Sequence, residues 1–139
     1  MNKDIKTSDT RIIACHTIQK ELEHAMEVTG RVFPVTYLES SLHDTPKILN
    51  ETLQRTVEEA CRDGAGRILL GYATCGNSVA GLSTGTCEVI LPRTDDCVTF
   101  FLGSMQRRRE MPAGTYYLTH GWLYDGGHGQ AYYDEIMEK

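Results

Sequence analysis

Short apolar segments alternate with segments of helical periodicity along this 139-residue chain, and this alternation restricts the fold more than any other feature. The apolar segments are residues 11–15, 32–38, 68–70 and 88–91, which read as strands. Strands that alternate with helices indicate βαβ units and a parallel sheet. We therefore expect an α/β fold, a Rossmann-like open sheet of about four mainly parallel strands with flanking helices.

The chain is long enough for one domain that buries about two-thirds of the surface exposed by its unfolded form. We expect a flexible N-terminus at residues 1–10, a single α/β domain at 11–124, and a flexible or truncated start of a C-terminal helix at 125–139. Pro34 indicates that the second strand lies at an edge or starts irregularly.

Three helices are expected between and after these strands. Thr17, placed before Glu21, indicates the start of the first, and Pro46 is the expected first residue of the second, after Thr45 as its cap. The third is predicted over residues 98–109.

Charge and hydropathy argue against two kinds of partner. The formal net charge is −5 and the only basic run is residues 107–109, so no footprint for nucleic acid is visible. No apolar stretch approaches the roughly 20 residues of a membrane span, and the first ten residues are too polar for a secretory signal. We expect a cytoplasmic protein whose five cysteines are reduced thiols, metal ligands or redox groups and do not form a disulfide framework.

Three of the cysteines share one topological position. Cys15, Cys75 and Cys97 each follow a predicted strand directly, and His43 lies a few residues after another. In a parallel sheet, residues that follow strands emerge along one edge, where ligands of open α/β sheets bind. The other two, Cys61 and Cys87, fall on a helix face and before a strand, and we interpret them as core or structural residues.

This arrangement suggests a metal centre. Thiolates select zinc, copper(I) or iron–sulfur, and three thiolates leave a coordination position open to substrate or to His43 as a fourth ligand. The competing interpretation is that Cys15, Cys75 and Cys97 are small buried side chains in tight turns.

A small-molecule site is expected beside this centre. Asp96 is explained equally well as a helix cap and Asn77 as a turn residue, while Glu21 is either a supporting group or part of a helix cap with Thr17. The complete set of expected binding residues is His16, Gly76, Asn77, Arg93, Asp96, Thr119 and Trp122.

Four motifs resemble a known family. They are CHTIQKELE from Cys15, LGYATCGN ending at Asn77, PRTDDC ending at Cys97 with FLGS after it, and GTYYLTHGW ending at Trp122. In this order they resemble the bacterial and archaeal family called domain of unknown function 1638, over residues 11–124.

The resemblance implies a protein of mostly anaerobic bacteria and methanogens, often encoded near corrinoid-dependent methyltransferases, with cysteines matching Cys15, Cys75 and Cys97. This chain has Asp95 where the family often has His, and members usually continue well past residue 139.

Three functions follow as hypotheses. The first is a metal-binding protein that holds an iron–sulfur cluster, slightly favoured by the implied anaerobic setting, or zinc, with a small-molecule ligand and a role in corrinoid or one-carbon metabolism. The second is a metal-free enzyme with Cys75 as a nucleophile activated by His16 or His43. The third is a non-catalytic accessory protein of a corrinoid methyltransferase. Association of the chain with copies of itself, as a homo-oligomer, is a further alternative.

Overall fold

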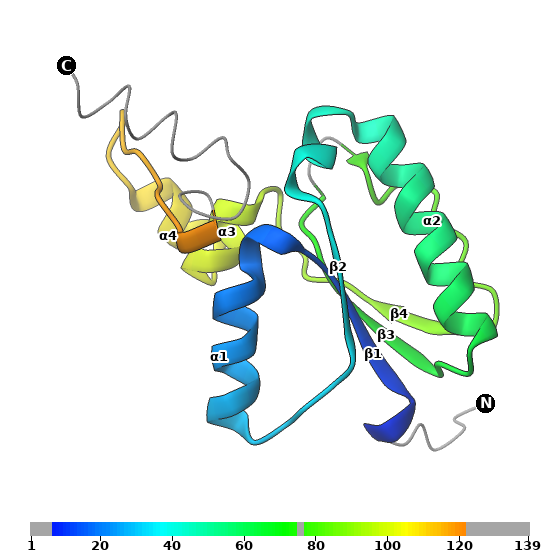
Figure 1. The fold of residues 1–139 in the computed structure, drawn as a ribbon. Coiled ribbons are helices and arrows are strands. Elements are labelled where there is room, and N and C mark those ends of the chain that lie inside the picture. The colour runs from blue at the N-terminus through cyan, green and yellow to red at the C-terminus, as the bar shows by residue number, and fades with distance from the viewer. Residues whose placement is uncertain (1–6, 75–76, 122–139) are drawn as a thin grey trace.

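The computed structural model describes residues 7–74 and 77–121 (Figure 1). The expectations for Cys75, Gly76, Trp122 and the helix start at 125–139 lie outside the described residues, as does the side chain of His43.

Four parallel strands form the single sheet of the described residues, in the order β2-β1-β3-β4. Their bounds are Thr10–Cys15 for β1, Val35–Leu38 for β2, Arg67–Gly71 for β3 and Glu88–Ile90 for β4. Ile12 of β1 is in register with Val35 on one side and Leu69 on the other, and Ile68 with Val89. The predicted open parallel α/β sheet is therefore confirmed.

The second strand is an edge strand, as Pro34 predicted. It begins only at Val35, because proline lacks the N–H that a strand donates, although the Pro34 carbonyl still accepts the Ile12 N–H at 2.9 Å. Thr10, expected in the flexible N-terminus, is the buried first residue of β1 and follows a short 3-10 turn at Thr7–Asp9.

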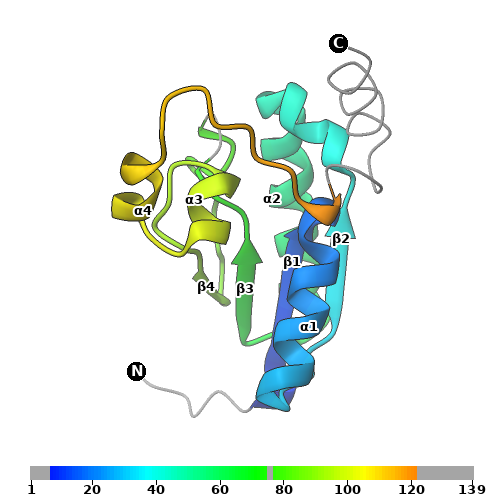
Figure 2. The same cartoon turned by 90° about the vertical axis from the view of Figure 1, so that its left-hand side faces the viewer.

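Helices lie on both faces of the sheet. Helix α1 (Gln19–Thr29) covers one face and α2 (Pro46–Arg62) the opposite face, with the strands between them (Figures 1 and 2). Each helix connects two parallel strands, so the chain forms two βαβ units that share β2, and the second of them crosses over β1.

The two faces are packed very differently. On the α2 face the side chains of Ile13, Leu53 and Ile68 are each at most 1% exposed. On the other face α1 contributes no buried residue, and contacts β1 through half-buried side chains such as Leu22 and Met26. The α2 face is consequently the main hydrophobic core.

The last part of the described chain departs from the sequence prediction. The single helix expected over 98–109 is wrong: α3 (Cys97–Leu102) and α4 (Met105–Glu110) are separate. Gly103 breaks the helix with a left-handed φ of 82°, and the Ser104 hydroxyl accepts the Arg107 N–H at the start of α4. Residues 115–119 form no strand, and this part of the chain crosses above α3 as a loop (Figure 2).

Cys61 and Cys87 form a disulfide, with their Cα atoms 5.7 Å apart. They join the end of α2 to the residue before β4, at the edge of the sheet where β3 and β4 begin. The expectation of reduced thiols was wrong for this pair, because the turn from α2 into β3 brings Cys61 beside Cys87, the residue that precedes the neighbouring strand β4. Their structural role agrees with the interpretation from sequence.

None of the helices in the described residues combines the length and the apolar character that a membrane crossing requires.

Candidate functional site at the carboxyl ends of the strands

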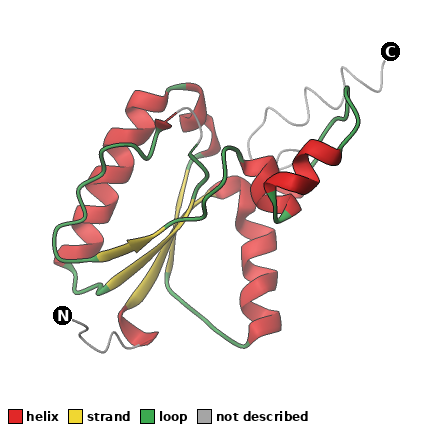
Figure 3. Ribbon diagram, turned by 180° about the vertical axis from the view of Figure 1, so that it is seen from behind, coloured by secondary structure: helices red, strands yellow, loops and turns green. Residues whose placement is uncertain are grey.

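The edge of the sheet formed by the carboxyl ends of its strands has a topological switch point. From β1 the chain passes to β2 on one side, whereas from β3 it passes to β4 on the other, so neighbouring strands β1 and β3 lead away in opposite directions. Ligands of open α/β sheets bind at such points. Figure 3 shows the four strands fanning out from this edge, with the loops that follow them gathered around it.

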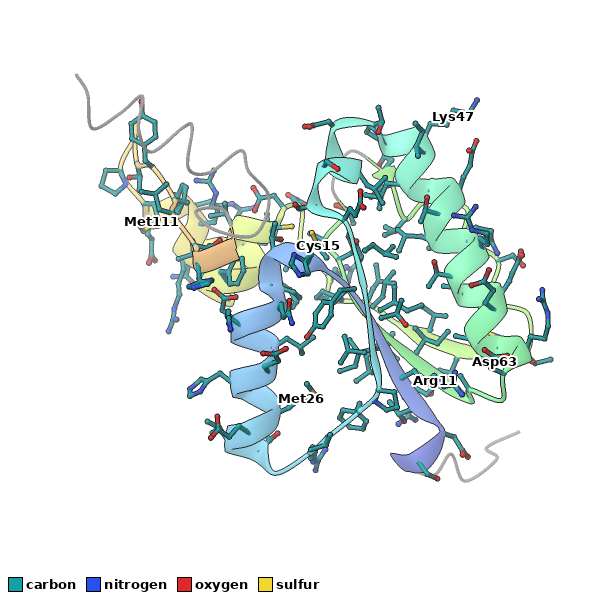
Figure 4. The ribbon with its side chains drawn as sticks, in the orientation of Figure 1. Arg11, Cys15, Met26, Lys47, Asp63 and Met111 are labelled. Atoms are coloured by element: carbon teal, nitrogen blue, oxygen red, sulfur yellow. A yellow bond between two sulfur atoms is a disulfide. The ribbon has the colours of Figure 1, made fainter. Side chains whose placement is uncertain are left out.

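Cys15 is the last residue of β1 and lies at this switch point. Its side chain is 7% exposed and packs with the core cluster on the α2 face. The Thr17 hydroxyl donates a hydrogen bond to its sulfur at 3.1 Å. Figure 4 labels Cys15 where β1 leads into the turn before α1. The structure places its sulfur below the surface with a donor already directed at it.

The loop after β3 is joined to the loop after β4. The backbone N–H of Thr74 donates to the carbonyl of Thr94 at 3.0 Å, and the Thr74 hydroxyl lies 3.2 Å from that carbonyl and 3.3 Å from the carbonyl of Asp95. Thr74 immediately precedes Cys75, while Thr94 and Asp95 precede Cys97 by three and two residues. The described chain thus brings these two cysteine-bearing loops together.

The chain after Cys75 is held against α2. The side-chain amide of Asn50 donates to the carbonyls of Ser78 and Ala80, at 2.7 and 2.9 Å. Gln54 exchanges two hydrogen bonds with the backbone of Ser83. Asn77 has a left-handed φ of 65°, a conformation that asparagine tolerates better than most residues, and so it serves the turn.

Asp96 caps α3, the structural alternative considered from the sequence. Its carboxylate accepts the Thr99 N–H at 2.7 Å, and a second oxygen lies 3.7 Å from the guanidinium of Arg108. Burial alone would raise the pKa of Asp96, but the hydrogen bonds with Thr99 and the charge of Arg108 outweigh it, and the pKa is lowered.

Arg108 connects this cap to the loop after α4. Its guanidinium donates to the Tyr117 hydroxyl at 2.9 Å and lies 4.8 Å from the centre of the Tyr117 ring. The basic run 107–109 therefore includes a structural residue and is more than a solvated helix face. Arg93 is exposed in the loop that precedes Cys97.

The loop after α4 reaches the turn that follows β1. A Cβ on Gly121 would collide with the backbone of Thr17, so only glycine permits this approach. Thr119 lies two residues earlier and is half-buried, and His16 packs edge-on against the ring of Tyr37 at 6.0 Å. Sequence reasoning missed Gly121, although its position in the last motif was a usable signal.

The described residues therefore assemble part of the expected site. Cys15 and His16 lie together at the end of β1, Thr119 precedes the Gly121 that approaches Thr17, and Asp96 and Cys97 follow the loop joined to Thr74. His43 falls on the short 3-10 helix Ser40–Asp44 after β2. Within residues 7–74 and 77–121 no three His, Cys, Asp or Glu side chains are placed to hold a metal ion, and Cys75 is outside that range.

Taken together, the sheet order and the edge define a Rossmann-like α/β protein with Cys15 at its switch point. The family model described as "Protein of unknown function (DUF1638)" matches residues 37–139, and the chain belongs to this family. The matched range begins later than the motif around Cys15 and extends beyond the range of resemblance expected from the motifs. No curated protein and no solved structure matches the chain.

Proposed function

We propose that Cys15, Cys75 and Cys97 hold a soft metal centre at the carboxyl ends of the strands, an iron–sulfur cluster or zinc. The observation that carries the proposal is the pairing of Thr74 with Thr94 and Asp95, since it joins the loops that bear Cys75 and Cys97. Cys15 ends the strand directly beside β3. These contacts of the neighbouring residues support a common edge for the three thiols.

The surroundings of Cys15 suit a metal ligand. Coordinated thiolates commonly accept hydrogen bonds from neighbouring groups, and the Thr17 hydroxyl supplies one. A buried thiolate needs such compensation, because burial disfavours its charge. The disulfide pair, by contrast, lies at the opposite edge and takes no part.

Thiolates favour zinc or iron–sulfur over magnesium or calcium. A centre held by three of them has a further coordination position, which either His43 or a small-molecule ligand would occupy. Bound zinc would supply Lewis acidity or activate a thiol substrate, and a cluster would supply redox chemistry or a free iron site. The chain's own contribution is to exclude water from Cys15 and to hold the loops in place.

The test is metal analysis with a visible absorption spectrum on protein purified without oxygen. We expect near-stoichiometric iron or zinc in the parent and loss of metal in each of Cys15→Ser, Cys75→Ser and Cys97→Ser. The control is the double variant Cys61→Ser/Cys87→Ser, which removes two sulfurs at the other edge and should retain metal.

A second variant tests the loops without touching a thiol. Thr74→Val removes the hydroxyl that contacts two carbonyls, and should lower metal occupancy or speed its loss to a chelator. Absence of metal in the parent after anaerobic reconstitution would refute the proposal. An enzymatic activity that is lost only in Cys75→Ser would then favour the thiol enzyme with His16 or His43. If no activity is found, the accessory role beside a corrinoid methyltransferase would be favoured.

A further inference from the structure

A cavity of about 510 Å³ opens on the α1 face of the sheet. It lies between α1, the ends of β3 and β4, and α3, where Figure 2 shows α1 and α3 standing apart in front of the strands. Its size is within the range of small-molecule sites. It borders the carboxyl ends of β3 and β4, but among the described residues none of the binding residues expected from the sequence lines it.

The walls of the cavity are apolar. They include Leu22 of α1, Leu69 of β3, Ile90 of β4, and both Phe100 and Phe101 of α3. The two phenylalanine rings stand edge to face, with their centroids 6.3 Å apart. Ile90 is 45% exposed at the mouth, so the apolar surface is open to a ligand. An apolar body of moderate size would lose water-exposed surface on entering.

One polar side chain interrupts these walls. Glu21 is the sole ionisable residue among the described residues that line the cavity. Its Oε2 atom is inaccessible to solvent and has no hydrogen-bond partner. The great majority of buried polar atoms are paired, so a ligand donor that reaches this half-buried carboxylate would meet no competing partner among the described residues.

A helix cap does not explain Glu21. The cap position of α1 is Ile18, which makes no side-chain cap bond. Thr17, the partner considered from the sequence, directs its hydroxyl at the sulfur of Cys15. A carboxylate on an apolar wall is costly unless it is paired, and within the described structure no cation pairs with it.

We propose that this cavity binds a protonated amine that carries an apolar body, with the ammonium group on Glu21 and the body against Leu69 and the two phenylalanines. An ionised carboxylate only accepts hydrogen bonds, and an ammonium group only donates them. A carboxylic acid of the same shape would bring a second negative charge to the site. A second copy of the chain is the poorer occupant. A twofold contact would bring this surface against the same surface of the other copy, so that the two Glu21 carboxylates would face each other.

The experiment uses three ligands of equal chain length: n-octylamine, n-octanol and octanoate. Binding is measured by calorimetry at neutral pH and located by carbon-13 methyl NMR of the isoleucines, of which Ile12, Ile18 and Ile90 line the cavity. We expect octylamine to bind at least tenfold more tightly than octanoate and to shift these three methyl groups.

Two variants and a control sharpen the assignment. Glu21→Gln should weaken octylamine binding at least tenfold and leave octanol unchanged, whereas Glu27→Gln, on an exposed residue of the same helix, should change neither. Ala25→Phe places a ring at the exposed cavity mouth without altering the core and should weaken both ligands.

Equal binding of the three ligands, or octylamine binding that survives Glu21→Gln, would overturn the proposal. So would methyl shifts of Ile12, Ile18 and Ile90 that follow protein concentration instead of ligand, because they would make this face a contact between copies of the chain.

Discussion

Gly71 is the last residue of β3, beside β1 at the switch point, and replacing it by alanine tests how tightly the two strands pack there. In register it pairs with Ala14. A Cβ at position 71 would lie 2.7 Å from the Cβ of Ala14, 3.0 Å from the Cδ1 of Ile18 and 3.3 Å from the Cα of Ala14. Two of these three atoms belong to Ala14, a buried residue of the central strand that has little freedom to move.

Two effects of Gly71→Ala oppose one another. The backbone of Gly71 is not left-handed, so alanine would stabilise the fold by about 0.4–1 kcal/mol through the unfolded chain if space allowed. Overpacking of a core costs about 1–3 kcal/mol. The contact with Ala14 is shorter than real Cβ atoms tolerate, so the overpacking term decides the sign, and we expect a net loss of about 1–2 kcal/mol.

The assay is chemical denaturation of Gly71→Ala, Ala14→Gly and the double variant. Ala14→Gly removes the atom in closest contact, and residues in direct contact couple by about 0.5 kcal/mol or more. The double variant should therefore be more stable than the sum of the single effects predicts. A Gly71→Ala protein as stable as the parent, or strictly additive single effects, would refute the packing argument.

Other predictions concern the two faces, the cap and a buried hydroxyl. Leu53→Ala, at a fully buried position, should cost about 2–5 kcal/mol in denaturant unfolding, and Leu22→Ala beside the open cavity about 1 kcal/mol; equal losses would contradict the asymmetry of the two faces. Asp96→Ala should cost about 1 kcal/mol through loss of the cap, whereas Asp95→Ala, on an exposed side chain, should cost less than about 0.5 kcal/mol. Tyr37→Phe should match the parent at neutral pH, because the Tyr37 hydroxyl is buried without a partner. Burial, and next the charge of Glu23, raise the pKa of Tyr37 above its usual 10.0, so the parent loses stability as the pH rises above 10.0, and Tyr37→Phe should lose less in thermal unfolding over that range.

Much of the fold was predictable from local patterns. The alternation of strands and helices predicted the parallel sheet, Pro34 predicted the edge strand, and Pro46 predicted the first residue of α2. These features depend on backbone restrictions that act within a few residues. The break in the helix expected at 98–109 is also a local feature, because it depends on Gly103 and Ser104. It was missed because apolar residues continue at helical spacing across these two residues.

The candidate site divides in the same way. That Cys15 ends a strand and that Asp96 can cap a helix are local properties of the sequence. The hydrogen bonds of Thr74 to the loop after β4 depend on the order of the strands, which brings residues about twenty positions apart into contact. The local pattern of apolar and polar residues does not indicate which residues of these two loops will meet.

What the sequence determined by itself is the alternation of strands and helices and the position of Cys15 at the end of a strand, because strand periodicity and chain direction are local properties. The tertiary structure alone decided that Cys61 meets Cys87 and that Glu21 lies on an apolar cavity. A helix pattern specifies which side chains share a face. Which elements that face contacts depends on how closely the neighbouring helices and strands pack. Here α1 and α3 leave a cavity between them and the sheet, and it exists only in the folded protein.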